Sequence, residues 1–327
     1  MKFAHLRAKP HVDGTFSEHR SSKYRFAGLA KHVTSKPLVV ALTCGMLSSL
    51  FVAAGPSTAG AASVYKTPSF PKVAAAVKQL PKAIKQSGVI HIAMVTNQPP
   101  GSYYAAGTTT LIGMDPSIAQ LLVQALGLKA IWTVTSFTEI IPGISAGRYQ
   151  MTVSEMAPEV SREKMLSFVD YAQTGDALAV VKGNPNHVNM NKLCGVTVGA
   201  MAGSYQVTQV LPAYQKACTK AGKPAINLKL YPDESSPILA LAAGRIAAVY
   251  EDSPVLDYAA TQNSAIEIQT NRDFGPIAVG MGKTLGLEKA VHTAMTAILK
   301  SSQYRTVLAH WGLSSVAITT AKVNDNG

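Results

Sequence analysis

The chain has 327 residues, of which 47% are hydrophobic and 15% charged, so it can bury substantial cores and is long enough for two globular units. This composition excludes a chain that is disordered outside its ends. Residues 1–36 carry eight Lys or Arg against Asp13 and Glu18, and therefore hold half of the formal charge of +12. The rest has no run of Lys and Arg with interleaved aromatics, which argues against a nucleic-acid-binding protein.

A targeting segment follows the basic stretch. Residues 37–55, PLVVALTCGMLSSLFVAAG, contain no charged side chain, and Ala59-Gly60-Ala61 has the small-x-small form of a signal-peptidase site. We predict a basic leader and signal peptide over residues 1–61, with export to the periplasm, the exterior or the cell surface. A membrane anchor is the alternative. It is disfavoured because the apolar run ends in small residues and no basic stop follows.

Strands and helices alternate along the remaining chain. A proline-broken helical segment over 62–87 ends at Gly88, and the alternation begins there. This order predicts α/β layering in two similar units placed in series. The first unit is predicted to contain a strand at 89–96, a helix at 114–128, a strand at 129–137, a helix at 137–148, a strand at 149–156 and a helix opened by Pro158; the second contains a strand at 194–201, a helix at 205–221, a strand at 226–232, a helix at 236–245 and a strand at 246–252.

Two cysteines remain once the leader, with Cys44, is removed. Cys194 and Cys218 both lie beside turn signals, and an even pair in an oxidising compartment favours a disulfide. Such a bridge stabilises by ~3 kcal/mol on the chain-entropy model. Two buried thiols are the alternative.

Motifs for catalysis or for a cofactor are missing from the sequence. Four of the eight histidines lie in the leader, and none has metal-ligand spacing with Cys, Asp or Glu. The stretch GMGKT at 280–284 lacks the earlier glycine of a phosphate-binding loop. We therefore expect no metal, no nucleotide and no other cofactor.

Several stretches together resemble the family 3 solute-binding proteins that serve ABC importers for polar amino acids. They are GMDPSIA, SFTEIIPGISAGRYQM, SEMAPEVSREKMLSFVDY, GSY, GRIAAVYEDSP and SSQYRTVLAHWG, and the resemblance covers residues 76–313. It implies a two-lobed periplasmic-binding-protein-like fold (type II), in which two α/β lobes are joined by two crossing strands. We expect residues 88–180 and 278–327 in lobe 1 and residues 181–277 in lobe 2. Hinges are expected near 179–184 and 271–280.

The resemblance also implies a binding site for a small zwitterion. Arg162 matches the family arginine that holds the ligand carboxylate, Ser204 matches a hydroxyl at the same group, and Asp252 matches the acid that holds the ammonium. Each ligand charge needs a charged partner when it leaves water. From spacing alone, Arg162 could instead form a solvated ion pair with Glu159, and Asp252 could cap the helix that begins at Pro254.

The positions that resemble the family's aromatic walls are altered. Gln98 and Gly101 flank the Pro-Pro pair where the family has aromatic residues that sandwich the ligand side chain. Phe137 or Tyr103 is expected to substitute. The identity of the bound amino acid therefore stays open.

A carboxylate also stands where the family has a small residue. Glu155 and Ala157 replace the usual Gly or Ser and the following Ser or Thr, and we include Ser154 and Glu155 among the ligand-binding candidates. If Glu155 points into the cleft, it competes for Arg162 or selects a cationic or amide-bearing side chain. If it points outward, only its backbone contributes.

The resemblance implies an extracytoplasmic component of an ABC importer that captures an amino acid between closing lobes. A monomer that docks on a membrane permease is expected, without nucleic acid. Two alternatives remain: a cyclohexadienyl-type dehydratase with Glu155 as its acid, and a sensor that docks on a receptor.

Overall fold

The computed structural model describes residues 65–324, with the backbone alone for residues 270–273. The predicted signal peptide, its cleavage site and the candidate anchor lie outside the described residues. Within residues 65–324, no helix is both long enough and apolar enough to cross a membrane.

Two short helices open the described chain. They are α1, Ala74–Gln79, and α2, Lys82–Ser87. Pro81 separates them, because it fixes its own backbone and lacks the N–H that a continuous helix needs. Gly88 ends the second helix with φ of 66°, a left-handed conformation that glycine adopts without steric cost. This agrees with the proline-broken pattern predicted for the segment.

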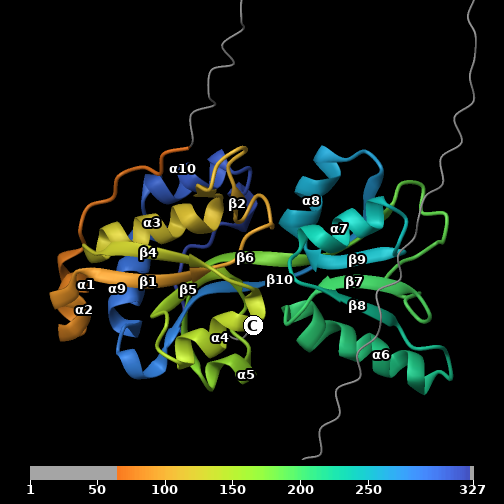
Figure 1. The fold of residues 1–327 in the computed structure, drawn as a ribbon, viewed down its shortest axis with the longest axis horizontal. Coiled ribbons are helices and arrows are strands. Elements are labelled where there is room, and N and C mark those ends of the chain that lie inside the picture. The colour runs from red at the N-terminus through yellow and green to blue at the C-terminus, as the bar shows by residue number, and fades with distance from the viewer. Residues whose placement is uncertain (1–64, 325–327) are drawn as a thin grey trace, which may run out of the picture. The chain divides into compact units, whose positions relative to one another are not determined.

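Eight strands form one mixed β-sheet (Figure 1). They are β1 Val89–Met94, β4 Lys129–Val134, β5 Met151–Met156, β6 Leu166–Val181, β7 Thr197–Met201, β8 Asn227–Tyr231, β9 Ala248–Asp252 and β10 Ile266–Gly282. The order is β4-β1-β5-β10-β6-β9-β7-β8. β1 is parallel to β4 and β5, and β7 is parallel to β8 and β9. The long strands β6 and β10 pair antiparallel between these two parallel groups.

Helices cover both faces of the sheet (Figure 1). Those of the first lobe are α3 Met114–Leu126, α4 Phe137–Ser145, α5 Val160–Glu163, α9 Glu288–Leu299 and α10 Ser302–His310; those of the second are α6 Leu211–Lys220, α7 Ser235–Ala242 and α8 Ser253–Gln262. A short hairpin of β2, Tyr103–Tyr104, and β3, Leu111–Ile112, lies apart from the large sheet. Separate hydrophobic clusters fill the two lobes. The predicted two-lobed α/β fold is confirmed.

β6 and β10 are the two crossing strands. β6 pairs with β9 of the second lobe from Asp176 onward, and β10 pairs with β5 of the first lobe from Ala278 onward. The register between β6 and β10 is irregular between Arg272 and Gly275. In this pairing the strands pass from one lobe to the other near residues 173–176 and 272–276. The predicted boundary and hinge at 179–184 lie a few residues further along β6. The predicted lobe limits and hinges remain predictions.

The predicted disulfide is present. Cys194 and Cys218 are bonded, and they join the segment before β7 to helix α6. Cys218 belongs to the hydrophobic core of the second lobe. The bridge thus ties a peripheral helix to the sheet.

Candidate functional site

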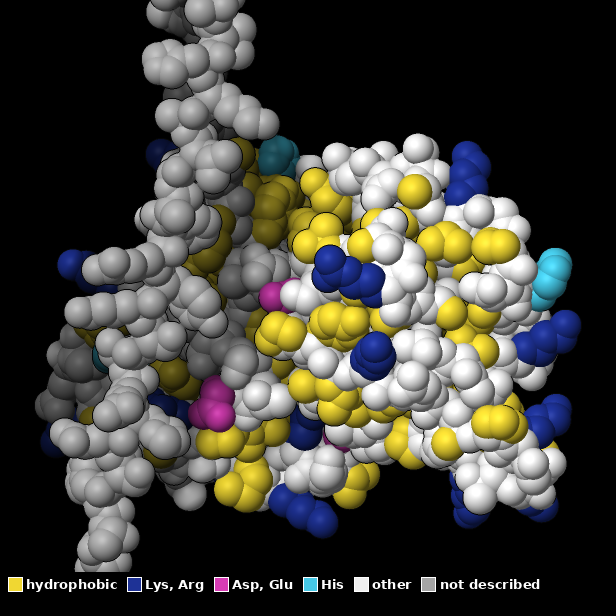
Figure 2. All heavy atoms as spheres, turned by 45° about the vertical axis from the view of Figure 1, so that its right-hand side comes forward, with side chains coloured by type: hydrophobic (Ala, Val, Ile, Leu, Met, Phe, Trp, Pro, Cys, Tyr) yellow, Lys and Arg dark blue, Asp and Glu magenta, His cyan; other side chains and the backbone are white. Residues whose placement is uncertain are grey.

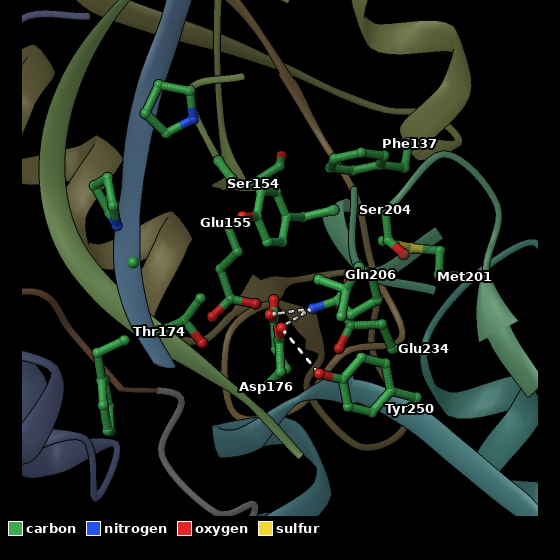
Figure 3. Close-up of a pocket in the computed structure, with 18 of the residues that line it drawn as sticks. Phe137, Ser154, Glu155, Thr174, Asp176, Met201, Ser204, Gln206, Glu234 and Tyr250 are labelled. Atoms are coloured by element: carbon green, nitrogen blue, oxygen red, sulfur yellow. Dashed lines mark hydrogen bonds between the residues drawn. The ribbon is translucent and has the colours of Figure 1, made fainter. Parts of the chain in front are cut away.

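A cavity of about 260 Å³ lies where the two lobes meet. First-lobe residues from α4, the end of β5 and α5 line one side, and second-lobe residues that follow β7, precede α7 and end β9 line the other. Figure 3 shows these side chains around β6 and β10. Six predicted site residues line it: Phe137, Ser154, Glu155, Arg162, Ser204 and Asp252.

Gln98 and Tyr103 do not line this cavity. The Tyr103 ring packs edge-on against Trp311 with centroids 6.1 Å apart, so it does not replace the family's aromatic wall. Gln98 is buried, and its Nε2 donates to Glu155 Oε2 at 2.8 Å. It therefore lies behind the cavity and holds a residue that lines it.

Arg162 lies on α5, a helix of one turn. Its side chain is 7% exposed and forms an ion pair with Glu159 at 2.6 Å. The guanidinium also donates to the Ala157 carbonyl at 2.9 Å and to the Gly203 carbonyl at 2.8 Å, and it lies over the Phe137 ring. The pair with Glu159 is thus present but buried, where the sequence suggested a solvated one.

Glu159 connects the two lobes. Thr208 Oγ1 donates to its carboxylate at 3.0 Å and Gln209 Nε2 at 2.7 Å, and both donors belong to the second lobe. Arg162 reaches the same lobe through the Gly203 carbonyl. A buried ion pair with these added hydrogen bonds is better compensated for its loss of hydration than a bare pair.

Glu155 and Gly101 form one structural unit. A β-carbon at Gly101 would stand 2.7 Å from Glu155 Oε2, so the carboxylate occupies the space that a side chain at 101 would need. Glu155 has φ of 49°, an uncommon conformation for a residue with a side chain. Its N–H donates to the Tyr171 hydroxyl at 2.9 Å. The two departures seen in the sequence therefore complement each other, and Glu155 lines the cavity.

Asp252 ends β9 and faces the cavity. Gln206 Nε2 donates to Asp252 Oδ1 and to Asp176 Oδ1, each at 2.8 Å, and the Tyr250 hydroxyl donates to Asp176 (Figure 3). Asp252 stands at the N-cap position of α8 but makes no side-chain capping bond. The capping alternative is therefore wrong, because this carboxylate accepts from Gln206.

Glu234 is a cavity residue that the sequence analysis missed. It lies directly before α7, is 2% exposed, and its Oε2 has no hydrogen-bond partner among the described residues. The preceding Asp233 accepts from the Ser236 N–H at 2.8 Å and caps the helix. The sequence did contain a signal for this residue: two acidic residues precede the helix, and only one of them is needed to cap it. Within the described part of the chain, the buried Ser204 Oγ also lacks a hydrogen-bond partner.

Three carboxylates converge across the cleft. Each of Glu155, Glu234 and Asp252 contributes an oxygen, and these oxygens lie within 4.8 Å of one another. Figure 3 shows Glu155 and Glu234 near Asp176 in the middle of the cavity. Because like charges at this separation repel, the arrangement fits a cationic group between the lobes. The same three residues could hold a metal ion, so the expected absence of a metal remains a prediction.

Burial raises the pKa of every carboxyl in this cluster. The pKa of Asp252 rises to about 8, first through desolvation and then through the charge of Asp176. Desolvation is the main cause that holds the pKa values of Glu155 and Glu234 well above their usual range. The charges of neighbouring carboxylates are the second cause. Desolvation lowers the pKa of Arg162, and Glu159 opposes this shift. A bound cation would restore the charged forms of the acids.

The acids of this basic chain are concentrated inside it. Arg162 is the one buried Lys or Arg among the described side chains. Eight acidic side chains are buried there: Asp115, Glu155, Glu159, Asp170, Asp176, Glu234, Glu251 and Asp252. On the face drawn in Figure 2, Lys and Arg are spread singly and few acids are visible. The positive surface therefore says little about the ligand, which meets an acidic cavity.

Known proteins resemble this chain over most of the described part. The model of the bacterial extracellular solute-binding proteins, family 3, matches residues 90–314. The arginine-binding protein ArgT of Corynebacterium glutamicum is 23% identical over 75% of this chain and 81% of its own length. A probable amino-acid ABC transporter periplasmic-binding protein of Sinorhizobium fredii, y4tE, is 28% identical over 58% of this chain and 59% of its own.

Solved structures share the fold. An ancestral arginine-binding protein bound to arginine superposes with a TM-score of 0.63 and 24% identity, over 68% of this chain and 98% of that one. At this identity the similarity establishes the two-lobed architecture. The choice of ligand has to be argued from the cavity.

Proposed function

This chain belongs to the bacterial extracellular solute-binding proteins, family 3, and we propose that its cavity captures an amino acid with a cationic side chain for an ABC importer. The observation that carries this choice is the convergence of Glu155, Glu234 and Asp252 within 4.8 Å. A neutral or acidic side chain would leave these buried carboxylates without a counter-charge.

The proposed ligand uses three groups of contacts. Its carboxylate lies at Arg162 and at the unpartnered hydroxyl of Ser204, which carry the positive and donor groups of the cavity. Its ammonium lies at Asp252, and its side-chain cation lies between Glu155 and Glu234. Arg162 already donates hydrogen bonds to two carbonyls and forms an ion pair with Glu159. It therefore binds the carboxylate with its remaining N–H groups.

Closure follows from the distribution of these charges. Glu155 belongs to the first lobe, whereas Glu234 and Asp252 belong to the second. Closing the lobes therefore brings like charges close together, and they repel. A ligand cation removes this repulsion and contacts both lobes, and it therefore stabilises the closed form over the open one. The closed form is the one that a permease would recognise.

A thermal-shift screen of the full chain tests the ligand class. Arginine, lysine and ornithine are expected to raise the midpoint, because a ligand that binds only the folded state stabilises it by mass action; glutamine, glutamate and calcium chloride serve as comparison. Glu234→Gln and Arg162→Ala should each weaken arginine binding at least about tenfold. Glu139→Gln, which removes an exposed acid, is the matched control.

Two results would overturn this ligand class. A larger shift with glutamine or glutamate than with arginine would show that the carboxylates do not select a cation. A shift with calcium alone, lost in Glu234→Gln, would assign the three carboxylates to a metal ion instead.

A dehydratase is the second candidate, because the raised pKa of buried Glu155 suits a general acid. We propose that the chain is not an enzyme, because the matched family is one of solute-binding proteins and the relatives above are named as binding proteins. Incubation with prephenate and with arogenate distinguishes the two. Formation of an aromatic product that is lost in Glu155→Gln would establish the enzyme.

We also propose that the protein is exported, that it is a monomer and that it docks on a permease. N-terminal sequencing of the secreted protein should give Ala62 as the first residue if the leader is cleaved where the small residues indicate. Co-purification with a permease, in preference to a receptor, would support the importer over the sensor.

A further inference from the structure

A second cavity, of about 510 Å³, lies in the first lobe away from the cleft. The edge strand β4, the start of α3 and the β2–β3 hairpin form its walls. Trp132 and Trp311 both line it, and they are the two tryptophans of the chain. None of its residues lines the ligand cavity.

Aromatic side chains that line this second cavity are partly exposed. Trp132 is 38% exposed and Tyr104 is 41% exposed. Trp132 and Val134 line the cavity together, because residues two apart on a strand point to the same side. Exposed apolar side chains on an edge strand favour aggregation unless something binds them. Their position at a concave surface indicates a ligand.

The deeper wall is held in place by neighbouring contacts. Trp311 Nε1 donates to Ser117 Oγ at 3.1 Å, and its ring meets the Tyr65 ring edge-on at 5.3 Å. Tyr65 is stacked on His310 with centroids 3.7 Å apart. The Tyr65 hydroxyl is buried and has no hydrogen-bond partner within the described part of the chain. A fixed aromatic face therefore forms the deeper wall of this cavity.

The other groups at this cavity are polar and uncharged. Thr109, Thr110 and Gln120 supply hydroxyls and an amide, and none of the described residues that line the cavity is Lys, Arg, Asp or Glu. A charged ligand would find no counter-charge here. A purely apolar ligand would leave these donors and acceptors unmatched. The combination suits a ring that has an apolar C–H face and hydroxyls at its edge.

We propose that this cavity is a second binding site, for a neutral saccharide. A pyranose face would lie against Trp132, with Tyr104 beside it, and its hydroxyls would meet Gln120 and Thr110. The concave form favours a small ligand over a second copy of the chain, because an isologous contact needs a patch that complements itself.

Tryptophan fluorescence of the full chain tests the site directly, because both tryptophans line this cavity and none lines the cleft. Maltotriose and tri-N-acetylchitotriose are titrated as probes, and a saturable change in emission with at least one of them is expected. Trp132→Ala should weaken that binding about tenfold, with Trp311 as the remaining reporter. Glu139→Gln, which removes an exposed acid outside both cavities, should leave the saccharide affinity unchanged.

The proposal is overturned if neither saccharide gives a saturable change, or if Trp132→Ala binds as tightly as the parent chain. It is also overturned if the emission depends on protein concentration without saccharide and light scattering shows a dimer, since a second copy would then cover the rings. Failure of arginine to bind in the cleft would leave this result unaffected.

Discussion

At the scale of single residues, Glu155 and Gly101 show how one substitution requires another. The carboxylate of Glu155 lies where a side chain at position 101 would be, and Gln98 donates a hydrogen bond to it. Glu155 therefore fills the space that a side chain at position 101 would need, and the two residues form one feature of the pocket.

The variant Gly101→Ala tests this coupling. The new β-carbon would stand 2.7 Å from Glu155 Oε2, and the carboxylate can move because it ends a flexible side chain. We expect arginine affinity to fall about tenfold, the loss of roughly one charge-assisted hydrogen bond, with little change in the free energy of unfolding. Isothermal titration calorimetry and thermal denaturation measure the two quantities.

The double variant supplies the control. If Gly101→Ala acts by moving Glu155, it should have little further effect in the Glu155→Gln background, because the charge is already absent. Additive losses of affinity in the double variant would contradict the coupling.

At the scale of elements, the turns that end strands place the binding groups. β5 ends at Glu155 and Met156, β7 leads into Ser204, and β9 ends at Asp252. Parallel strands of an α/β sheet bring such ends to one edge, where ligands commonly bind. The second lobe adds α6, which the Cys194–Cys218 bond fixes to the segment before β7.

Removing this bond should destabilise the second lobe without altering the site. For Cys194→Ala with Cys218→Ala, we expect the free energy of unfolding to fall by about 3 kcal/mol, since the unfolded chain gains the entropy of an open loop. Urea denaturation measures the change. Arginine affinity under native conditions should stay the same, because neither cysteine lines the cavity. An unchanged urea midpoint would show that the bond does not constrain the unfolded chain.

At the scale of the whole molecule, a chain with a formal charge of +12 has an acidic interior. The carboxyl pKa values are raised to about 8 at Asp252 and to about 7 at Asp115. The folded state therefore binds more protons than the unfolded state, in which an Asp has a pKa of about 4. Stability from these groups is present below about pH 4 and is lost as the pH rises through 7 and 8.

A cationic ligand should reverse part of this loss. Arginine is expected to bind the ionised carboxylates, so its binding releases protons and strengthens as the pH rises from 6 to 8. Calorimetry in buffers of different ionisation enthalpy counts these protons, and thermal melts with and without arginine at each pH measure the stability. Proton uptake on binding, or affinity that falls over this range, would contradict the prediction.

The two-lobed fold, the disulfide and six of the residues that line the cavity could be predicted from the sequence. Alternating apolar segments, proline and glycine signals and motif order are local features, so they can be read along the chain. Arg162, Ser204 and Asp252 follow strands whose ends the topology brings together.

Which charges meet depends on how the two lobes pack. Glu234 and Glu155 are 79 positions apart, and no local pattern shows that their carboxylates converge. Arg162 forms the ion pair with Glu159 that their spacing allowed. The pair is buried, however, and Thr208 and Gln209 of the other lobe donate hydrogen bonds to Glu159. Burial and contacts across a cleft depend on how separate elements pack, and they set the pKa values and the ligand class.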